Sequence, residues 1–366
     1  MEDVLNKFRK IVKYTQRISG EEASKLGINP EKLSKKEEII PESKVVFSVE
    51  MRTDPLLGEY SDYTSLISEE RANRPGLPNN QKRTEENKDC IFCKPKSYYA
   101  LSVPAVNHRE VDVISVPNRF PSIIPHYVTI FSNKHKTDLA EIDFDDMFNY
   151  LRSGKDLAME FASQGLEGMI DYINWGVDAG GTQPHAHSQR QGIYAGTRGE
   201  ADKEIKAIEN RAIDLGMNPF DWYMSKVRDS GLFVFEDKEI FISAPFAPKF
   251  NNQIDIVTKN SKNYLDMDEK TMFAIAGGMA LVLSTMRRFS YEHNGEVIPA
   301  EITNINVVNH QTRFAHSSQN YRMHWHIYPR MSRIGGTELQ GFYGISLYPE
   351  ETARALRNVF IAKTSA

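Results

Sequence analysis

Two histidines and a glutamine at alternate positions form the group in this chain that is most typical of a reactive site. His185, His187 and Gln189 follow the turn Gly180-Gly181-Thr182. On a β-strand, every second residue points to the same face, so these three side chains can converge on one ligand. Imidazoles act as acids, bases and metal ligands, and a glycine-rich turn can hold an anion. The stretch therefore predicts a binding or reaction site on a strand.

Two further groups contain residue types that bind metals. His324 and His326 again alternate, and His310 lies shortly before them. Cys90 and Cys93 are the two cysteines of the chain, and their spacing suits a metal site or a redox pair better than a disulfide framework. This cysteine usage indicates a reducing compartment, so we expect a cytoplasmic location.

The elements that must position these residues are short strands and longer helices. From residue 45 onward, apolar runs punctuated by Pro and Gly predict strands, with examples at 111–116, 127–131 and 169–175. Helical periodicity, often opened by acidic residues, predicts helices at 139–164, 200–215, 218–228, 266–290 and 349–358. The mixture indicates an α+β fold.

A weak internal repeat indicates two related halves. The segment 121–135 runs from a proline through an apolar strand toward a helix at Leu139, and the segment 248–260 does the same before Leu265. We expect duplicated halves, each with mainly antiparallel strands flanked by helices. The expected units are residues 46–230 and 231–366. Residues 1–45 are rich in Lys and Glu, have helical periodicity at Val4, Phe8 and Val12, and are expected to form an extension.

Charge and hydropathy exclude several classes of partner. The chain of 366 residues has 45 Lys plus Arg and 49 Asp plus Glu, for a net charge of -4. Without a basic field, nucleic acid is not an expected partner, although small phosphates remain possible ligands. The longest apolar run, 272–283, is too short for a membrane span, and the first residues resemble no signal segment. We therefore expect a soluble protein without a membrane partner.

The order of six motifs resembles the galactose-1-phosphate uridylyltransferase family of the histidine-triad superfamily. The motifs are Arg52-Thr-Asp-Pro55, Arg71-Ala-Asn-Arg74-Pro75, Cys90-Ile-Phe-Cys93, Asn118-Arg-Phe-Pro121, Gly180-Gly-Thr-Gln-Pro-His-Ala-His-Ser-Gln189 and His324-Trp-His-Ile-Tyr-Pro329. The resemblance covers about residues 48 to 358 and implies a nucleotidyltransferase built from two histidine-triad-like halves. It also implies a homodimer.

The resemblance assigns roles to individual residues. It makes His187 the nucleophile that carries a covalent nucleotide. Gln189 then donates hydrogen bonds to the phosphoryl oxygens, as in transferase and phosphorylase branches rather than in hydrolases, which have a third histidine there. The implied substrate-binding residues, besides Gln189, are Arg52, Arg71, Arg74, Asn118, Asn174, Gly180, Gly181 and Thr182.

The same resemblance implies metal sites. It adds His135 and His185 to Cys90 and Cys93, which together would hold a structural zinc. A second site would combine His310, His324 and His326 with a carboxylate. Spacing leaves Glu200 and Glu204 open for that carboxylate, and we take Glu204 as the expected ligand. Such donors suit zinc or iron.

Two positions depart from the family pattern and affect the expected substrates. Ala186 replaces a proline between the motif histidines, which need not move either imidazole. Gly341-Phe342-Tyr343 stands where sugar transferases have Gly-aromatic-Glu, and Glu338 lies in the same loop. The expected reaction transfers a nucleoside monophosphate between a nucleotide sugar and a sugar 1-phosphate, with UDP-glucose and galactose 1-phosphate as first substrates. The alternatives are a phosphorylase of nucleotide sugars or dinucleoside polyphosphates, or a non-catalytic nucleotide-binding protein.

Overall fold

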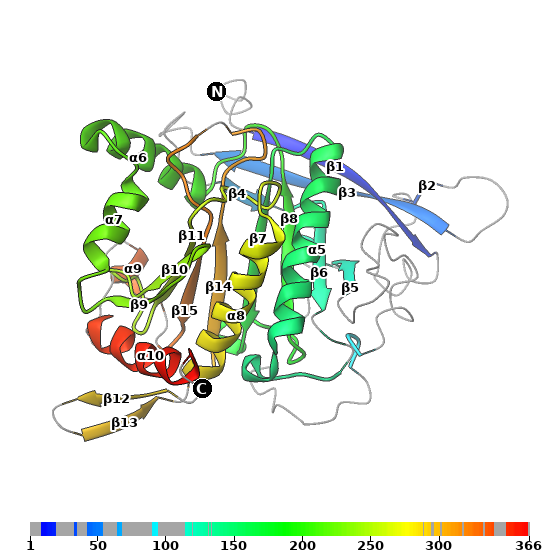
Figure 1. Ribbon diagram of the computed structural model, residues 1–366. Helices are drawn as coiled ribbons and strands as arrows, with labels where there is room; N and C mark the ends of the chain where they lie inside the picture. The colour runs from blue at the N-terminus through cyan, green and yellow to red at the C-terminus, as the bar shows by residue number, and fades with distance from the viewer. Residues whose placement is uncertain are drawn as a thin grey trace.

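A computed structural model describes most of the second half of the chain and separate segments of the first (Figure 1). The described residues are 9–19, 33–34, 42–53, 64–67, 90–93, 114–118, 120–130, 132, 134–287, 289–293, 296–300, 302–316, 318–331, 334–339 and 349–364.

A nine-stranded sheet is the centre of the described structure, and every neighbouring pair in it is antiparallel. Its spatial order is β5-β6-β8-β7-β14-β15-β11-β10-β9. The strands are β5 (Ile114–Pro117), β6 (His126–Ile130), β7 (Gly168–Trp175), β8 (His187–Ile193), β9 (Phe233–Glu236), β10 (Ile240–Ser243), β11 (Ile254–Thr258), β14 (Ile305–His310) and β15 (His324–Pro329). The α+β prediction is therefore confirmed.

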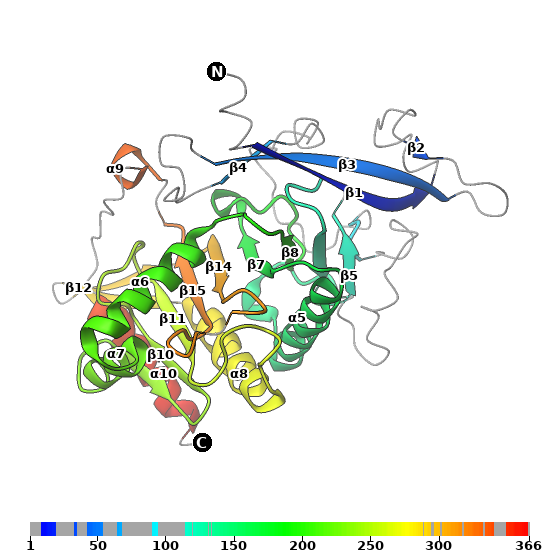
Figure 2. The same cartoon turned by 90° about the horizontal axis from the view of Figure 1, so that it is seen from above.

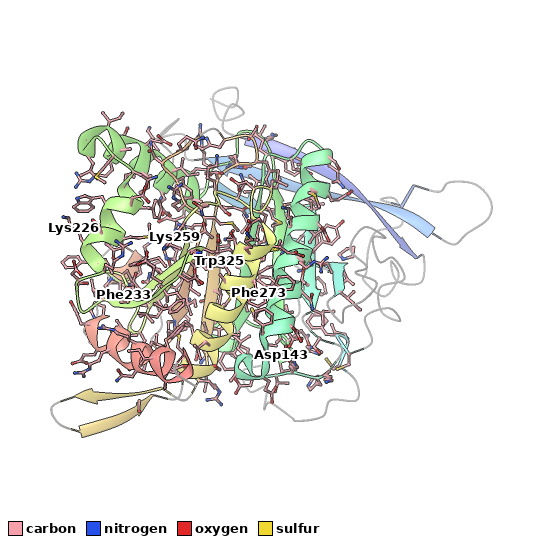
Figure 3. All side chains as sticks on the ribbon, viewed as in Figure 1. Asp143, Lys226, Phe233, Lys259, Phe273 and Trp325 are labelled. Carbon is pink, nitrogen blue, oxygen red and sulfur yellow. The ribbon has the colours of Figure 1, made fainter. Side chains whose placement is uncertain are left out.

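Two long helices cover one face of this sheet (Figure 2). They are α5 (Phe144–Ser163) and α8 (Glu269–Met286), and both begin at an aspartate whose side chain accepts from a backbone N–H of the first turn. Their apolar sides pack with alternate strand residues into one continuous core. Trp325 of β15 lies inside this core, whereas Phe273 of α8 is exposed (Figure 3). The opposite face carries polar residues of the strands and a smaller apolar cluster at β5 and β6.

The remaining elements surround the sheet, and the helices predicted between residues 139 and 358 are present. The other helices are η4 (Leu139–Glu141), η5 (Val177–Ala179), α6 (Glu200–Leu215), α7 (Pro219–Val227), α9 (Gly336–Leu339) and α10 (Pro349–Thr364). A separate hairpin joins β12 (Phe289–His293) to β13 (Glu296–Ala300). Among the described residues, no helix combines the length and apolarity that crossing a membrane requires.

The chain order strand, helix, strand, strand occurs twice in the sheet. It is β6-α5-β7-β8 in one part and β11-α8-β14-β15 in the other, where the separate hairpin β12–β13 lies between α8 and β14 in the chain. The strands β7 and β14 pair at the centre. The expected duplication of halves, and the boundary between residues 230 and 231, remain predictions.

The amino-terminal segment differs from the sequence-based expectation. The periodicity around Val12 predicted a helix, but β1 (Arg9–Ser19) is a strand that pairs along its length with β3 (Glu42–Thr53). The helical interpretation is wrong at Val12 because cross-strand pairing with a distant segment overrides a weak local pattern; Val4 and Phe8 lie outside the described residues. This small sheet also contains β2 (Leu33–Ser34) and β4 (Thr64–Ile67), and β1 and β3 run along the side opposite α5 and α8 (Figure 2).

Candidate active site and metal centres

His187 lies in a row of side chains that crosses four strands on the face opposite α5 and α8. In the register of the sheet, Asn174 is opposite Asn306, and Asn306 is opposite Tyr328. Tyr172 is opposite Gln189, so continuing the β7–β8 register by two residues brings Asn174 beside His187. The predicted site residues His187, Gln189 and Asn174 therefore share one face, as the alternation of strand residues requires.

The four predicted zinc ligands come together beside His187. Cys93 Sγ lies 3.2 Å from His135 Nδ1 and 3.5 Å from His185 Nδ1, and Cys90 Sγ lies 3.6 Å from His185 Nδ1. In a tetrahedral zinc site with Zn–S of ~2.3 Å and Zn–N of ~2.0 Å, sulfur and nitrogen ligands lie about 3.5 Å apart. The donor types and separations fit zinc.

The surroundings of His185 hold its ring in the tautomer and the neutral state that a metal ligand needs. Its Nε2 donates to the backbone carbonyl of Ser132 over 2.9 Å, so the lone pair is on Nδ1, which faces the cysteines. Burial is the main cause that lowers the pKa of His185 to about 4, and the charges of His135 and His187 act in the same direction. The ring is therefore neutral at neutral pH, as a metal ligand must be.

His187 is oriented by the backbone of the same strand. Its Nδ1 donates to the carbonyl oxygen of His185 over 2.8 Å, because a carbonyl can only accept. The lone pair of the neutral ring is therefore on Nε2. Phe92, which lies between the two cysteines, packs edge-on against the His187 ring with 4.9 Å between ring centroids. The turn from Cys90 to Cys93, which we call the knuckle, is thus in direct contact with the candidate nucleophile.

Gln189 has a defined amide orientation. The backbone N–H of Ser122 donates to His126 Nδ1 over 3.3 Å, so the ring proton of His126 is on Nε2, from which it is donated to Gln189 Oε1 over 3.0 Å. Tyr172 donates its hydroxyl to the same oxygen over 3.1 Å. With its oxygen held by two donors, Gln189 presents its NH₂ group to the site.

The Asn118 turn packs against the same part of the site. The side-chain nitrogen of Asn118 lies 3.1 Å from His126 Nε2, and its oxygen accepts from the N–H of Phe120 over 2.8 Å. Asn118 therefore lies at the edge of the site that is formed by β6 and β8.

The Gly180-Gly181 turn is shaped by contact with the end of β7. A Cβ at Gly181 would lie 2.6 Å from the carbonyl oxygen of Asn174, and Gly180 has φ +81. The N–H groups of Gly180 and Gly181 donate within the turn, to the carbonyls of Val177 and Gly176. Because these two N–H groups already donate within the turn, a bound phosphate would need hydrogen-bond donors from elsewhere in the site.

A second set of metal-binding side chains lies on the same face, at β14 and β15. Glu204 accepts from His310 Nδ1 at 2.5 Å, and its other oxygen lies 3.1 Å from His324 Nε2. The side-chain donors of Glu204, His310, His324 and His326 all lie within 4.8 Å of one another. Asp255 holds His326 Nδ1 at 2.8 Å, so Nε2 is the ring atom left for a metal.

Glu204, rather than Glu200, is the carboxylate of this cluster. Burial alone would raise the pKa of Glu204, but the charge of His324 and hydrogen bonds from His310 and His324 hold it well below its usual value. Glu200 instead pairs with Lys203 and Lys249 at the surface. Three imidazoles and one carboxylate fit zinc or iron, as predicted.

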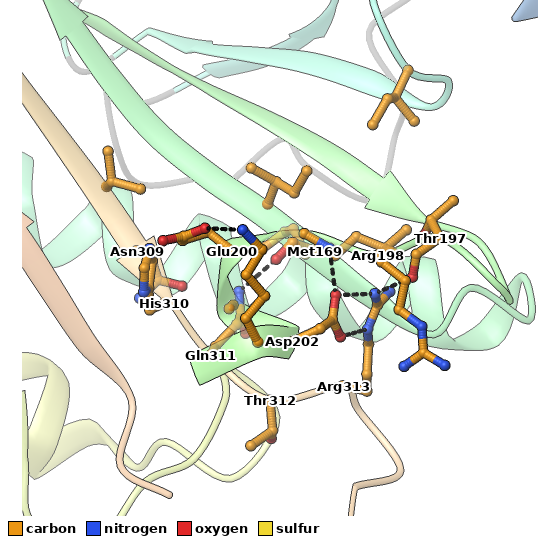
Figure 4. A pocket seen from close by; sticks show the side chains of 17 residues that line it. Met169, Thr197, Arg198, Glu200, Asp202, Asn309, His310, Gln311, Thr312 and Arg313 are labelled. Atoms are coloured by element: carbon orange, nitrogen blue, oxygen red, sulfur yellow. Dashed lines mark hydrogen bonds and ion pairs between the residues drawn. The ribbon is translucent and has the colours of Figure 1, made fainter. Parts of the chain in front are cut away.

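A cavity of about 430 Å³ lies beside this cluster, at the start of α6 (Figure 4). Ile170, Ile193 and Val308 form part of its apolar wall, and His310 links it to the metal ligands. The Arg313 guanidinium, bonded to Asp202, closes one side.

Beneath the site, a buried charge pair joins β7 to β8 on the opposite face. Arg190 and Asp171 are fully buried, with 3.4 Å between Arg190 Nε and Asp171 Oδ1. Asp171 Oδ2 also accepts from the hydroxyls of Tyr150 and Tyr264, at 2.6 and 2.5 Å. Because Arg190 directly follows Gln189, this network sets the register of the strand that holds the site.

Several predicted site residues lie wholly or partly outside the described structure. Arg71, Arg74 and the triplet Gly341-Phe342-Tyr343 lie outside the described residues, and only the backbones of Arg52 and Glu338 are described. Residues of the site that the sequence analysis did not select include His126, Tyr172 and Phe92. The alternation of strand residues along β6 and β7 could have indicated His126 and Tyr172. It places them in the site, however, only when β8 is known to pair with both strands.

These features define an α+β protein with a candidate cysteine–histidine metal site next to a histidine–glutamine pair on a nine-stranded antiparallel sheet. No protein-family model and no curated protein sequence matches the chain. Solved structures do match it: a uridylyltransferase aligns with 85% of this chain and 98% of its own at TM-score 0.63 and 19% identity.

Two plant proteins share the same fold. An ADP-glucose phosphorylase from Arabidopsis thaliana, solved with bound ADP-glucose, aligns with 84% of this chain and 98% of its own at TM-score 0.62 and 19% identity. A GalT-like protein from the same plant aligns with 67% of this chain and 83% of its own at TM-score 0.57 and 18% identity. The chain therefore shares the fold of the uridylyltransferase and of these two plant proteins, so the resemblance drawn from its motifs is confirmed at the level of fold.

Proposed function

We propose that the protein transfers a nucleoside monophosphate between two phosphate-containing substrates through a covalent nucleotidyl-His187. The observation that carries this proposal is the pairing of His187, whose Nδ1 hydrogen is donated to a carbonyl, with Gln189, whose side-chain oxygen is held by His126 and Tyr172 so that its NH₂ group is left to donate. One ring nitrogen is thus nucleophilic, and hydrogen-bond donors lie two residues away on the same strand face.

The reaction balances without a proton from the protein. Nε2 of His187 attacks the α-phosphorus of a nucleotide sugar, a P–N bond forms, and the P–O bond to the sugar 1-phosphate breaks with its electron pair on the leaving oxygen. An acceptor phosphate oxygen then attacks the same phosphorus, and the P–N electron pair returns to Nε2. The carbonyl of His185 stabilises the imidazolium charge in between because it accepts from Nδ1.

In this proposal, the two candidate metal centres have a structural role. A zinc bound by Cys90, Cys93, His135 and His185 would hold the knuckle against β8, and through Phe92 it would restrain the His187 ring. The second cluster would fasten α6 to β14 and β15, because Glu204 comes from the helix and the histidines from the strands.

The first candidate substrates are UDP-glucose and galactose 1-phosphate. The further residues that would bind them are Asn118, Asn174, Thr182 and the three predicted arginines. A phosphorylase that uses inorganic phosphate is the second candidate, because Tyr343 stands where the family's sugar transferases place a hexose-binding glutamate. A homodimer and a cytoplasmic location remain part of the proposal.

The test is direct detection of the covalent intermediate. The purified protein would be incubated with a panel of α-³²P-labelled nucleotide sugars, separated on a denaturing gel and treated with acid. Acid-labile label on the wild type that is discharged by a sugar 1-phosphate or by phosphate supports the proposal and identifies the acceptor. Binding of nucleotide sugars without any covalent label would replace it with the non-catalytic reading.

A further inference from the structure

Arg330 directly follows β15 and lies next to the row of side chains that contains His187. Its NH1 donates to Asn306 Oδ1 over 2.9 Å. Asn306 in turn donates to Asn174 Oδ1 and to the carbonyl of Ala179, both over 2.8 Å. Arg330 is thus joined, through one asparagine, to the residue beside His187 and to the loop that precedes the nucleophile.

The guanidinium of Arg330 has hydrogen-bonding capacity left over. Its Nε is buried and has no acceptor in the described part of the chain, which also provides no carboxylate in an ion pair with it. The group lies over the ring of Phe250, with 4.9 Å to the ring centroid. Burial lowers the pKa of Arg330, and the charge of Asp178 partly opposes this effect. An arginine remains charged at neutral pH, and a half-buried cation without a carboxylate in an ion pair with it is costly unless an anion joins it.

The position of Arg330 indicates which anion this would be. Asn306 lies two strands from His187, which at about 4.8 Å per strand is ~10 Å across the sheet. On the other side of His187, β6 and β8 contribute Asn118, His126 and Gln189. A substrate that reaches from the α-phosphorus toward β14 and β15 therefore meets Arg330 at the end away from the Asn118 turn.

We propose that Arg330 binds the phosphate of the second substrate, a phosphate monoester dianion or inorganic phosphate. This rests on the proposed function, since the anion matters as the acceptor that discharges nucleotidyl-His187. The planar guanidinium fork suits phosphate oxygens, and its link to Asn306 and Asn174 holds the fork in place. The predicted arginines of the amino-terminal motifs are not needed for this contact.

The experiment separates loading of His187 from its discharge. Wild type, Arg330→Gln, Arg330→Lys, Arg330→Ala and the control Arg228→Gln would be loaded with a labelled nucleoside 5′-phosphorimidazolide, which has no second phosphate. Loss of label would then be followed at increasing concentrations of inorganic phosphate, of a sugar 1-phosphate, and in water alone. Arg228 is a suitable control because it lies far along the chain from the site and pairs with Glu236.

We expect Arg330→Gln to raise the half-saturating acceptor concentration by about 10- to 100-fold, the loss typical of a hydrogen bond to a charged group. Arg330→Lys should fall between this variant and the wild type, and Arg228→Gln should match the wild type. Added guanidinium ion should restore part of the acceptor step in Arg330→Ala, which a merely structural defect would not show. If Arg330→Gln raises the half-saturating concentration of one acceptor more than that of the other, the more strongly affected acceptor is the ligand of Arg330.

Two results would overturn the inference. An unchanged half-saturating acceptor concentration in Arg330→Gln would remove Arg330 from the acceptor site while leaving nucleotidyl-His187 intact. An equal slowing of discharge to water and to phosphate would assign Arg330 a structural role only. Absence of label on the wild type with every donor would instead refute the proposed function itself.

Discussion

The backbone carbonyl of His185 accepts the Nδ1 hydrogen of His187 over 2.8 Å, while the His185 ring faces the two cysteines. One residue therefore serves as a candidate metal ligand through its side chain and orients the candidate nucleophile through its backbone. Any change that moves the metal site should also move His187.

Replacing His187 with glycine should reduce full turnover by at least about 10³-fold, since the covalent step is lost. A nucleoside phosphorimidazolide should still transfer its nucleotide directly to the acceptor, because its own imidazole fills the vacated space. The measurement is product formation with nucleotide sugar and with phosphorimidazolide as alternative donors. His316→Gly, outside both histidine clusters, is the matched control, and near wild-type turnover in His187→Gly would show that another residue is the nucleophile.

The Cys90→Ser variant should contain about one zinc fewer per chain and should unfold at a lower denaturant concentration. The physical reason is that metal binding contributes to the free energy of folding. Elemental analysis together with urea unfolding, with and without a chelator, makes the measurement. Zinc content equal to that of the wild type would exclude a metal at the knuckle.

Glu204→Gln should remove metal from the second cluster, whereas Glu200→Gln should not. Glu204 lies within reach of His310 and His324, but Glu200 pairs with surface lysines. The two variants differ by one helical turn of α6 and have the same change in charge, so they control for each other. Equal metal content in both would contradict the assignment.

Arg190→Met should destabilise the fold by about 3–5 kcal/mol, because it leaves Asp171 buried without its cation. Adding Asp171→Asn should recover part of this loss, since the remaining tyrosine hydroxyls can still donate to the amide oxygen. Urea unfolding of the two single variants and the double variant measures the coupling. Additive free energies would show that the pair does not act as a unit.

Glu236 should contribute to the acid sensitivity of the fold. A hydrogen bond from Arg228 is the main cause that lowers its pKa to about 2, with Lys259 acting in the same direction. Because the folded-state pKa lies below the unfolded value, the stabilisation is complete above about pH 4.5 and is lost as the pH falls toward 2. The expected contribution is below about 1 kcal/mol since Arg228 is half exposed.

Unfolding free energies of the wild type and Glu236→Gln, measured from pH 7 down to about pH 2, provide the test. The two proteins should converge at low pH. A difference that grows as the pH falls would reverse the expected sign.

Local patterns in the sequence were sufficient for much of the fold and the site. Alternation placed His187 and Gln189 on a strand, although His185 lies just before β8, and acidic residues at helix starts identified α5, α6 and α8. These signals depend on residues close in the chain. The motif order pointed to the fold that the solved structures share, and the cysteine spacing identified half of a metal site.

Tertiary structure alone decided what depends on pairing between distant segments. The choice of Glu204 over Glu200 follows from how α6 packs on β14 and β15, and the role of His126 follows from the register of β6 on β8. Val12 lies in a strand because β3, some thirty residues away, offers a partner. Arg330 contacts Asn306 because β15 pairs with β14, and Asn306 contacts Asn174 because β14 pairs with β7. Local preferences amount to tenths of a kcal/mol per residue, whereas sheet pairing and burial add over whole elements, so the long-range contacts prevail.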